Sequence, residues 1–173
     1  MRIRSLASLF CLFFVLDGGT SVRAEGLDLL VFGASGRVGG HVVSEALDRG
    51  HRVSGVSRNP AGLANTHENF RAVEGDILDI DSVAALVEGH DVVVVSVRGV
   101  VPGAERPEDS LVYRGIENVV AALRHAKDAP RLVHVGGAGS LEIEPGVLLA
   151  DRLPRFLLPR DFEFELDGQV MAL

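Results

Sequence analysis

The stretch from Val31 to His41, VFGASGRVGGH, decides how this chain folds. It follows an apolar run and precedes a segment with helical periodicity, and its glycines are spaced G-x-x-G-x-x-G: Gly33, Gly36 and Gly39. In such a strand–turn–helix, the glycines permit a sharp turn, close approach of a pyrophosphate to backbone N–H groups, and tight helix–strand packing. The helix N-terminus adds free N–H groups and partial positive charge. The turn predicts dinucleotide binding, with a glycine turn kept for packing alone as the alternative.

Strand-like and helix-like segments alternate after this turn. Five of the seven residues of the run Asp91–Val97 (DVVVVSV) are the β-branched residue valine, which is typical of a central parallel strand buried on both faces. Helical periodicity over Val38–Arg49 places Val38 on the buried face of that helix, and Asp79 or Asp81 can cap a later one. The predicted strands are Leu27–Phe32, Arg52–Ser57, Phe70–Glu74, Asp91–Val97 and Arg131–Val135, and the predicted helices are Val38–Arg49, Ser82–Glu88 and Val112–Lys127. This order predicts an α/β fold, a doubly wound parallel sheet with strand order 3-2-1-4-5.

The end of the second predicted strand indicates which dinucleotide binds. NAD-binding proteins of this architecture usually carry a carboxylate there for the ribose 2′-hydroxyl, whereas this chain reads Ser57, Arg58, Asn59. The Arg58 guanidinium can pair with a 2′-phosphate, and Arg37 in the glycine turn can add a second cation. The pattern favours NADP over NAD. The alternative makes both arginines ordinary loop cations.

Two further polar residues end predicted strands at the edge where ligands bind in such sheets. Asp76 follows the third strand, where the adenine would lie, and its alternative role is a turn or helix-cap aspartate. Ser96 ends the fourth strand, where it would face the nicotinamide ribose, and its alternative role is a buried hydroxyl bonded to backbone.

The first 24 residues have the three-part pattern of a secretory signal peptide. Arg2 and Arg4 precede an eleven-residue apolar core, LASLFCLFFVL, which is shorter than the about 20 residues that span a bilayer. Cleavage after Ala24 would give a periplasmic or secreted protein and leave residues 25–146 as a nucleotide-binding domain and 147–173 as a divergent tail. The alternatives are an uncleaved anchor, or a misplaced start site and a cytoplasmic protein.

Composition excludes several classes of function. The 173 residues carry a formal net charge of −7, which argues against nucleic acid or an anionic membrane as the main partner. Apolar residues make up 47% of the chain, enough for a sizeable core. The single cysteine, Cys11, excludes a disulfide framework within the chain and a cysteine-cluster metal site, so we expect no metal.

The order of these segments resembles the atypical short-chain dehydrogenases/reductases, and within them the NmrA-like proteins and the NADH-flavin reductase group. The matching stretches lie between Leu27 and Gly146 and include GDILDIDSVAALVEGHDVVVVSV, GIENVVAALRHA and RLVHVGGAGSLEIEPG. The resemblance implies NAD(P)H binding at Gly33, Ser35, Gly36, Arg37, Val38 and Arg58, with adenine near Asp76 and Ile77. It also implies that Gly136, Gly137 and Ala138 line the nicotinamide side.

The chain departs from this group in its catalytic pair. Short-chain dehydrogenases use Tyr-x-x-x-Lys for proton transfer, but the one tyrosine, Tyr113, has Glu117 four residues on and is interpreted as helix packing. His134, within an apolar strand, is interpreted as a hydrogen-bonded strand histidine. Hydride transfer to a flavin or quinone needs mainly positioning, because the cofactor carries the chemistry. The sequence therefore assigns no catalytic residue.

The pattern shared with the group ends near Val147, so we expect the usual sixth strand and substrate lobe to be missing. Three interpretations stay open. The chain is an NADPH-dependent reductase of a flavin, quinone or similar flat acceptor, or a non-catalytic NmrA-like module that senses NADP(H), or an inactive truncated fragment.

Overall fold

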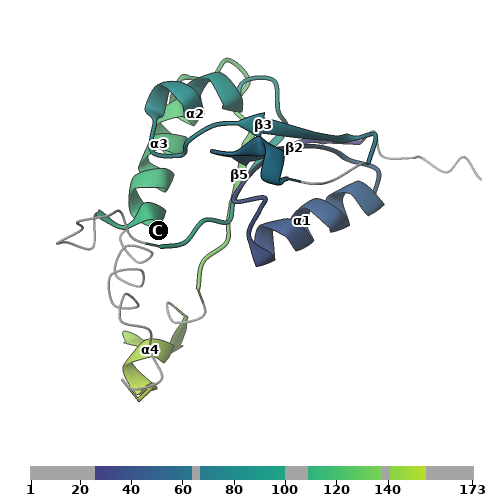
Figure 1. The fold of residues 1–173 in the computed structure, drawn as a ribbon. Helices are drawn as coiled ribbons and strands as arrows, with labels where there is room; N and C mark the ends of the chain where they lie inside the picture. The colour runs from purple at the N-terminus through teal and green to yellow at the C-terminus, as the bar shows by residue number, and fades with distance from the viewer. Residues whose placement is uncertain (1–25, 64–66, 100–108, 138–140, 155–173) are drawn as a thin grey trace, which may run out of the picture.

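A five-stranded parallel sheet forms the centre of the molecule (Figure 1). The computed structural model describes residues 26–63, 67–99, 109–137 and 141–154. Every neighbouring pair of strands is parallel, and the order is β3-β2-β1-β4-β5. The strands are β1 (Asp28–Phe32), β2 (Arg52–Ser57), β3 (Phe70–Glu74), β4 (Val92–Val95) and β5 (Arg131–His134). The predicted doubly wound α/β fold with order 3-2-1-4-5 is confirmed.

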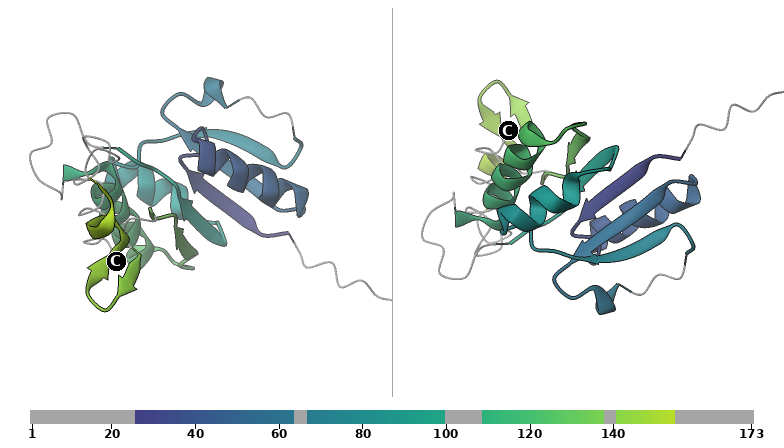
Figure 2. Two further views of the ribbon diagram at one scale, coloured as in Figure 1. Left: turned by 90° about the horizontal axis from the view of Figure 1, so that it is seen from below. Right: turned by 90° about the horizontal axis from the view of Figure 1, so that it is seen from above.

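Helices cover both faces of the sheet. They are α1 (Arg37–Asp48), α2 (Ile80–Val87) and α3 (Leu111–His125), each close to its predicted range. Figure 2 shows α1 on one face and α2 and α3 on the other. A short 3₁₀ helix, η1 (Pro60–Gly62), stands between β2 and β3. Since side chains alternate along a strand, the sheet supplies a separate apolar layer to each face.

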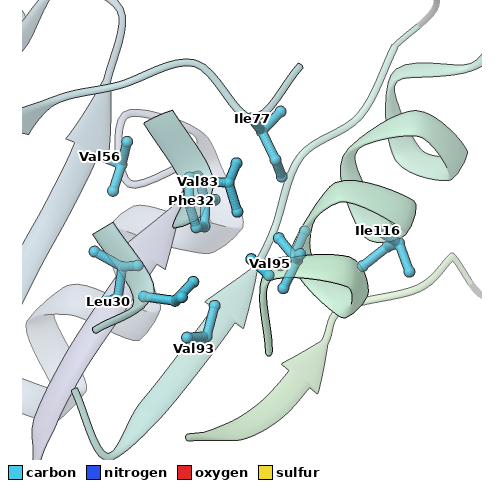
Figure 3. Close-up of a cluster of buried hydrophobic side chains, with 11 residues drawn as sticks. Leu30, Phe32, Val56, Ile77, Val83, Val93, Val95 and Ile116 are labelled. Atoms are coloured by element: carbon cyan, nitrogen blue, oxygen red, sulfur yellow. The ribbon is translucent and has the colours of Figure 1, made fainter. Parts of the chain in front are cut away.

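The two layers are the two halves of the core. Leu30, Phe32, Val93 and Val95 belong to the cluster beneath α2 and α3 (Figure 3). Val31 and Val94 belong to the cluster beneath α1. Three of the four residues of β4 are buried, as expected for a central strand with no solvent-facing side.

The buried face of α1 includes Ala46 and Leu47, as the predicted face of Val38, Val42, Ala46 and Leu47 does, but it excludes Val38. Val38 is 47% exposed, whereas Gly39, Val43, Ala46 and Leu47 are buried. The physical reason is the close contact of Gly39 with the turn that follows β1: a Cβ on Gly39 would overlap the Gly33 carbonyl oxygen. This contact centres the buried face on Gly39, and Val38 therefore points away from the sheet.

A small unit that the sequence did not predict follows the sheet. It consists of the antiparallel strands β6 (Glu142–Glu144) and β7 (Val147–Leu148) and the helix α4 (Leu149–Arg152). The Leu149 N–H donates to the Leu141 carbonyl at 2.8 Å, and Arg152 Nη2 lies 3.3 Å from Glu144 Oε2. The unit lies away from the parallel sheet, near the lower end of the view in Figure 1. In the described part of the chain, β5 is the last strand of the parallel sheet.

The ends of the chain bear on the predicted export signal. Residues 1–24, with the predicted signal peptide, and residues 155–173 of the predicted tail lie outside the described residues. Across the residues that are described, none of the helices has the length and apolarity needed to cross a membrane.

His134, the last residue of β5, corrects another interpretation. Its Nε2 atom is buried and has no hydrogen-bond partner among the described residues, so the predicted hydrogen-bonded histidine is wrong for this nitrogen. Burial lowers the pKa of His134 below the ordinary value of 6.5, because loss of water disfavours the charged imidazolium. The folded chain therefore holds His134 neutral at neutral pH.

This shift predicts a loss of stability in acid. The unfolded chain takes up a proton at His134 near pH 6.5, whereas the folded chain resists it, so protonation favours unfolding as the pH falls below 6.5. We expect His134→Leu to lose less unfolding free energy than the wild-type chain between pH 7.5 and 5, measured by urea denaturation. The exposed His41→Gln variant is the control. Parallel pH dependence in His134→Leu and the wild-type chain would contradict this assignment.

The N-terminus of α2 gives a second test of the fold. Asp79 Oδ1 accepts the N–H groups of Asp81 and Ser82, at 3.0 and 3.4 Å, so Asp79 is the cap and Asp81 lies in the first turn. Asp79→Ala should lower the free energy of unfolding by about 1 kcal/mol, because two N–H groups lose their acceptor. Asp128→Ala, at an exposed position outside the helices, should leave it unchanged. An equal effect of the two substitutions in urea denaturation would count against the cap.

Candidate functional site

The glycine turn between β1 and α1 has the geometry that its spacing predicts. Gly33 has φ +84°, in the left-handed region that favours glycine, and a Cβ there would overlap the Ser96 carbonyl oxygen. The Gly36 N–H donates to the Gly33 carbonyl at 2.9 Å and closes the turn. The turn therefore brings the backbone of β1 close to the backbone that follows β4.

The N-terminus of α1 differs from those of the other two long helices. Ser110 caps α3 by accepting the Tyr113 N–H at 3.1 Å, and Asp79 caps α2. Gly36, at the corresponding position of α1, has no side chain to do this, and the first turn of α1 carries no acidic residue. The helix thus directs N–H groups and partial positive charge outward, with no carboxylate of its own to neutralise them. Such a helix start fits a pyrophosphate group.

A pocket of about 170 Å³ opens beside this turn at the carboxyl edge of the sheet. Five of the predicted cofactor residues line it: Gly33, Ser35, Arg58, Asp76 and Ile77. The remaining wall residues are Phe32, Val56, Ser57, Gly75, Val97 and Leu111. Apolar side chains, one guanidinium and one carboxylate thus share one pocket, a composition suited to a flat ring carried on a charged sugar phosphate.

The other predicted cofactor residues lie on the same edge but do not line this pocket: Gly36, Arg37, Val38, Gly39, Ser96, Gly136 and Gly137. Arg37 and Val38 are exposed in the first turn of α1. Ser96 is partly buried after β4, and Gly136 and Gly137 are exposed after β5. Ala138 lies outside the described residues. The pocket therefore gathers Arg58, Asp76 and Ile77 of the adenosine half but not Arg37, and none of the residues predicted for the nicotinamide half lines it.

Arg58 stands in a turn that its neighbours fix. Ser57 Oγ accepts the Asn59 N–H and donates to the Asn59 carbonyl, both at 3.1 Å. Arg58 itself is exposed, and no ion pair is formed by it with the described residues. Its guanidinium is thus available at the point where NAD-binding proteins usually carry a carboxylate.

Asp76 has the turn role that was its alternative interpretation. Its Oδ1 accepts the Leu78 N–H at 3.0 Å, and its own N–H donates to Ser82 Oγ at 3.3 Å, so it is a turn aspartate. It also lines the pocket. The carboxylate is therefore held in place by the β3–α2 turn while it faces the ligand space.

Sequence reasoning missed several pocket residues. Val97 follows β4 and Leu111 begins α3, and the Leu111 N–H donates to the Gly99 carbonyl at 3.0 Å, which joins the two segments. Gly75 left a weak signal, a glycine directly after a strand. A Cβ on Gly75 would come within 2.5 Å of Leu86 Cδ1, so the glycine lets α2 approach the sheet there.

No group of histidine, cysteine or carboxylate side chains within the described ranges could hold a metal ion. His90 has no other candidate metal ligand at a suitable spacing in the sequence. The distance between His90 Nε2 and Ser54 Oγ is 3.0 Å, and His90 Nδ1 is buried with no hydrogen-bond partner among the described residues. Neither residue belongs to the pocket.

Curated sequence relatives match this chain over part of their length. A 3 beta-hydroxysteroid dehydrogenase/Delta 5→4-isomerase of Mycobacterium tuberculosis is 40% identical over 76 residues, covering 44% of this chain and 20% of the relative. The uncharacterized protein YwnB of Bacillus subtilis is 32% identical over 114 residues, covering 66% of this chain and 49% of the relative. The chain thus spans about half or less of the length of these curated relatives.

Solved structures share the fold. A Burkholderia pseudomallei protein, named as exported, is 33% identical with a TM-score of 0.63, and the match covers 84% of this chain and 63% of that one. A Streptococcus pneumoniae protein, assigned by name to the NADH-flavin reductases, is 27% identical with a TM-score of 0.58 and coverages of 85% and 64%. The family model for NAD(P)H-binding proteins matches residues 33–155. This range contains the glycine turn, the pocket and α3, and the chain belongs to the NAD(P)H-binding family.

Proposed function

We propose that this protein is an NADPH-dependent reductase that passes hydride to a flavin, a quinone or a similar flat acceptor. One observation carries the choice of cofactor: Arg58 lines the pocket that begins at Gly33, and the end of β2 offers no carboxylate. A nicotinamide cofactor fits the uncapped start of α1 and the pocket beside it. The 2′-phosphate then distinguishes the two cofactors, and a guanidinium is the side chain best suited to hold it.

The residues of this chain bind and orient the cofactor. Backbone N–H groups at the start of α1 hold the pyrophosphate, and Gly36 leaves room for it. Arg58 holds the 2′-phosphate, with Arg37 as a second cation, and the wall of Asp76 and Ile77 receives the adenine. Gly136 and Gly137, exposed after β5, leave the nicotinamide side open to a flat ring.

The acceptor class follows from the proton requirement. The bound cofactor supplies the hydride. A flavin or quinone takes its accompanying proton from solvent, so the reaction does not need the Tyr-x-x-x-Lys pair that this sequence lacks. The names of the Streptococcus pneumoniae protein and of two similar enzymes, a cinnamoyl-CoA reductase of Medicago truncatula and an aldehyde reductase of Sporidiobolus salmonicolor, also support reductase chemistry.

The absence of that proton-transfer pair from the sequence also favours a second candidate. In this interpretation the chain is an NmrA-like module that binds NADP(H) and signals through a partner without turnover. Turnover is the property that distinguishes the two candidates. Export stays a prediction from the N-terminal sequence, with the name of the Burkholderia pseudomallei protein as its support.

Removal of the Arg58 side chain tests the cofactor. Arg58→Ala should weaken NADPH binding about tenfold, because a charge-assisted contact to the 2′-phosphate is lost, and should change NADH binding less than about twofold. The dissociation constants are measured by nucleotide fluorescence or calorimetry. Arg124→Ala, which removes an exposed arginine of α3 outside the pocket, is the matched control. Equal losses for NADPH and NADH would contradict the preference for NADP.

Oxidation of NADPH tests the reaction. We expect turnover with at least one of FMN, riboflavin and a short-chain quinone, measured as loss of NADPH absorbance. Gly36→Ala is the variant expected to lose cofactor binding. A Cβ there meets only the Gly33 carbonyl oxygen, at 3.2 Å, so we expect the fold to persist. The added methyl group obstructs the pyrophosphate. This variant should lose turnover. A wild-type chain that binds NADPH but reduces none of these acceptors would overturn the reductase and favour the binding module.

A further inference from the structure

A side chain of helix α3 is hydrogen-bonded to the main chain of one wall of the nucleotide pocket. The Asn118 Nδ2 group, on α3, donates to the Ile77 carbonyl at 2.9 Å, across 41 residues of sequence. Ile77 lines the pocket beside Asp76, in the turn between β3 and α2. A polar side chain from one helix thus fixes the main chain of a pocket wall that belongs to another part of the fold.

The side chain of Ile77 is held by the same helix. It is 6% exposed and belongs to the core cluster that includes Ile116 of α3 (Figure 3). A Cβ added at Gly115 would come within 2.9 Å of Ile77 Cδ1, so the absence of a side chain at Gly115 lets Ile77 pack directly on the helix. Helix α3 therefore fixes both the carbonyl and the side chain of Ile77.

The N-terminal end of α3 reaches the pocket directly. Leu111, the first residue of the helix, lines the pocket as well. Asn118 follows Leu111 by seven residues, about two helical turns along one rigid element. The separation of the Leu111 and Ile77 walls is therefore set by α3 and by the hydrogen bond that joins α3 to the β3–α2 turn.

We infer that Asn118 is a positioning residue for the adenine half of the cofactor. Its amide keeps the Ile77 carbonyl turned toward α3, and this orientation holds Asp76 and Ile77 as one wall of the adenine pocket. The inference rests on the proposed placement of adenine at this wall, and it does not depend on which acceptor is reduced. The nicotinamide half, which the proposal places further along the sheet edge, gains nothing directly from Asn118.

The two halves of the cofactor can be tested separately. Asn118→Leu keeps the approximate size of the side chain and removes the donor. It should weaken binding of NADPH and of 2′,5′-ADP by about 2- to 10-fold, the range for one hydrogen bond, and leave binding of reduced nicotinamide mononucleotide unchanged. Asn118→Gln, which retains an N–H donor, should recover part of the loss. Glu117→Gln, at the neighbouring exposed position, is the control.

A second measurement needs no nucleotide. Amide hydrogen exchange across residues 75–79 should be faster in Asn118→Leu than in the wild-type chain, because the turn loses its link to α3. Unchanged exchange there, or equal weakening of 2′,5′-ADP and the mononucleotide, would overturn the positioning role. The two proposals can fail separately. If Asn118→Leu weakens 2′,5′-ADP binding while the wild-type chain reduces no acceptor, the reductase is overturned and this inference is supported.

Discussion

The close approach of α1 to the turn that follows β1 is the contact on which the rest of the structure depends. Gly39 lies against the Gly33 carbonyl, and Gly33 lies against the Ser96 carbonyl, so three backbone segments meet where any Cβ would intrude. This contact fixes the rotation of α1, which decides which residues of the helix enter the core. It also aims the start of α1 along the sheet edge, where the pocket opens. Packing and ligand binding therefore make the same demand on the same glycines.

The termini of the three long helices show how the molecule separates stability from binding. Asp79 and Ser110 satisfy the first N–H groups of α2 and α3, where the structure gains from a capped helix. Gly36 leaves α1 without a side-chain cap, so the first N–H groups of α1 have no side-chain acceptor and can donate to a bound anion. The difference between α1 and the capped helices α2 and α3 is thus better explained by a ligand than by packing.

The parts of the fold that follow from local pattern were predictable. The bounds of β2 and β3 agree with the predicted ranges, because turn residues flank each short apolar run. The exposure of Val38 could not be predicted, because the periodicity of α1 does not reveal that the tight contact lies at Gly39. The unit of β6, β7 and α4 was missed for another reason. Its elements are two to four residues long, and contacts such as Arg152–Glu144 hold them in place rather than a periodic apolar face.

The site divides in the same way. The glycines and Arg58 were predictable because a motif and a strand end determine their positions, whereas Leu111 and Asn118 enter only through the packing of α3.

These two groups of residues do different work. A guanidinium on an exposed turn can distinguish phosphate from hydroxyl by charge alone, and it needs little precision from its surroundings. A wall that receives an aromatic ring acts through shape, so its backbone must be held to a fraction of an ångström. The structure matches this difference. The Ser57 side chain ties the turn of Arg58 to the nearby Asn59, whereas Ile77 is tied to a separate helix through both its carbonyl and its side chain. Arg58, and through the family resemblance Ile77, are thus visible in the sequence, whereas the contact that holds Ile77 to Asn118 requires the fold.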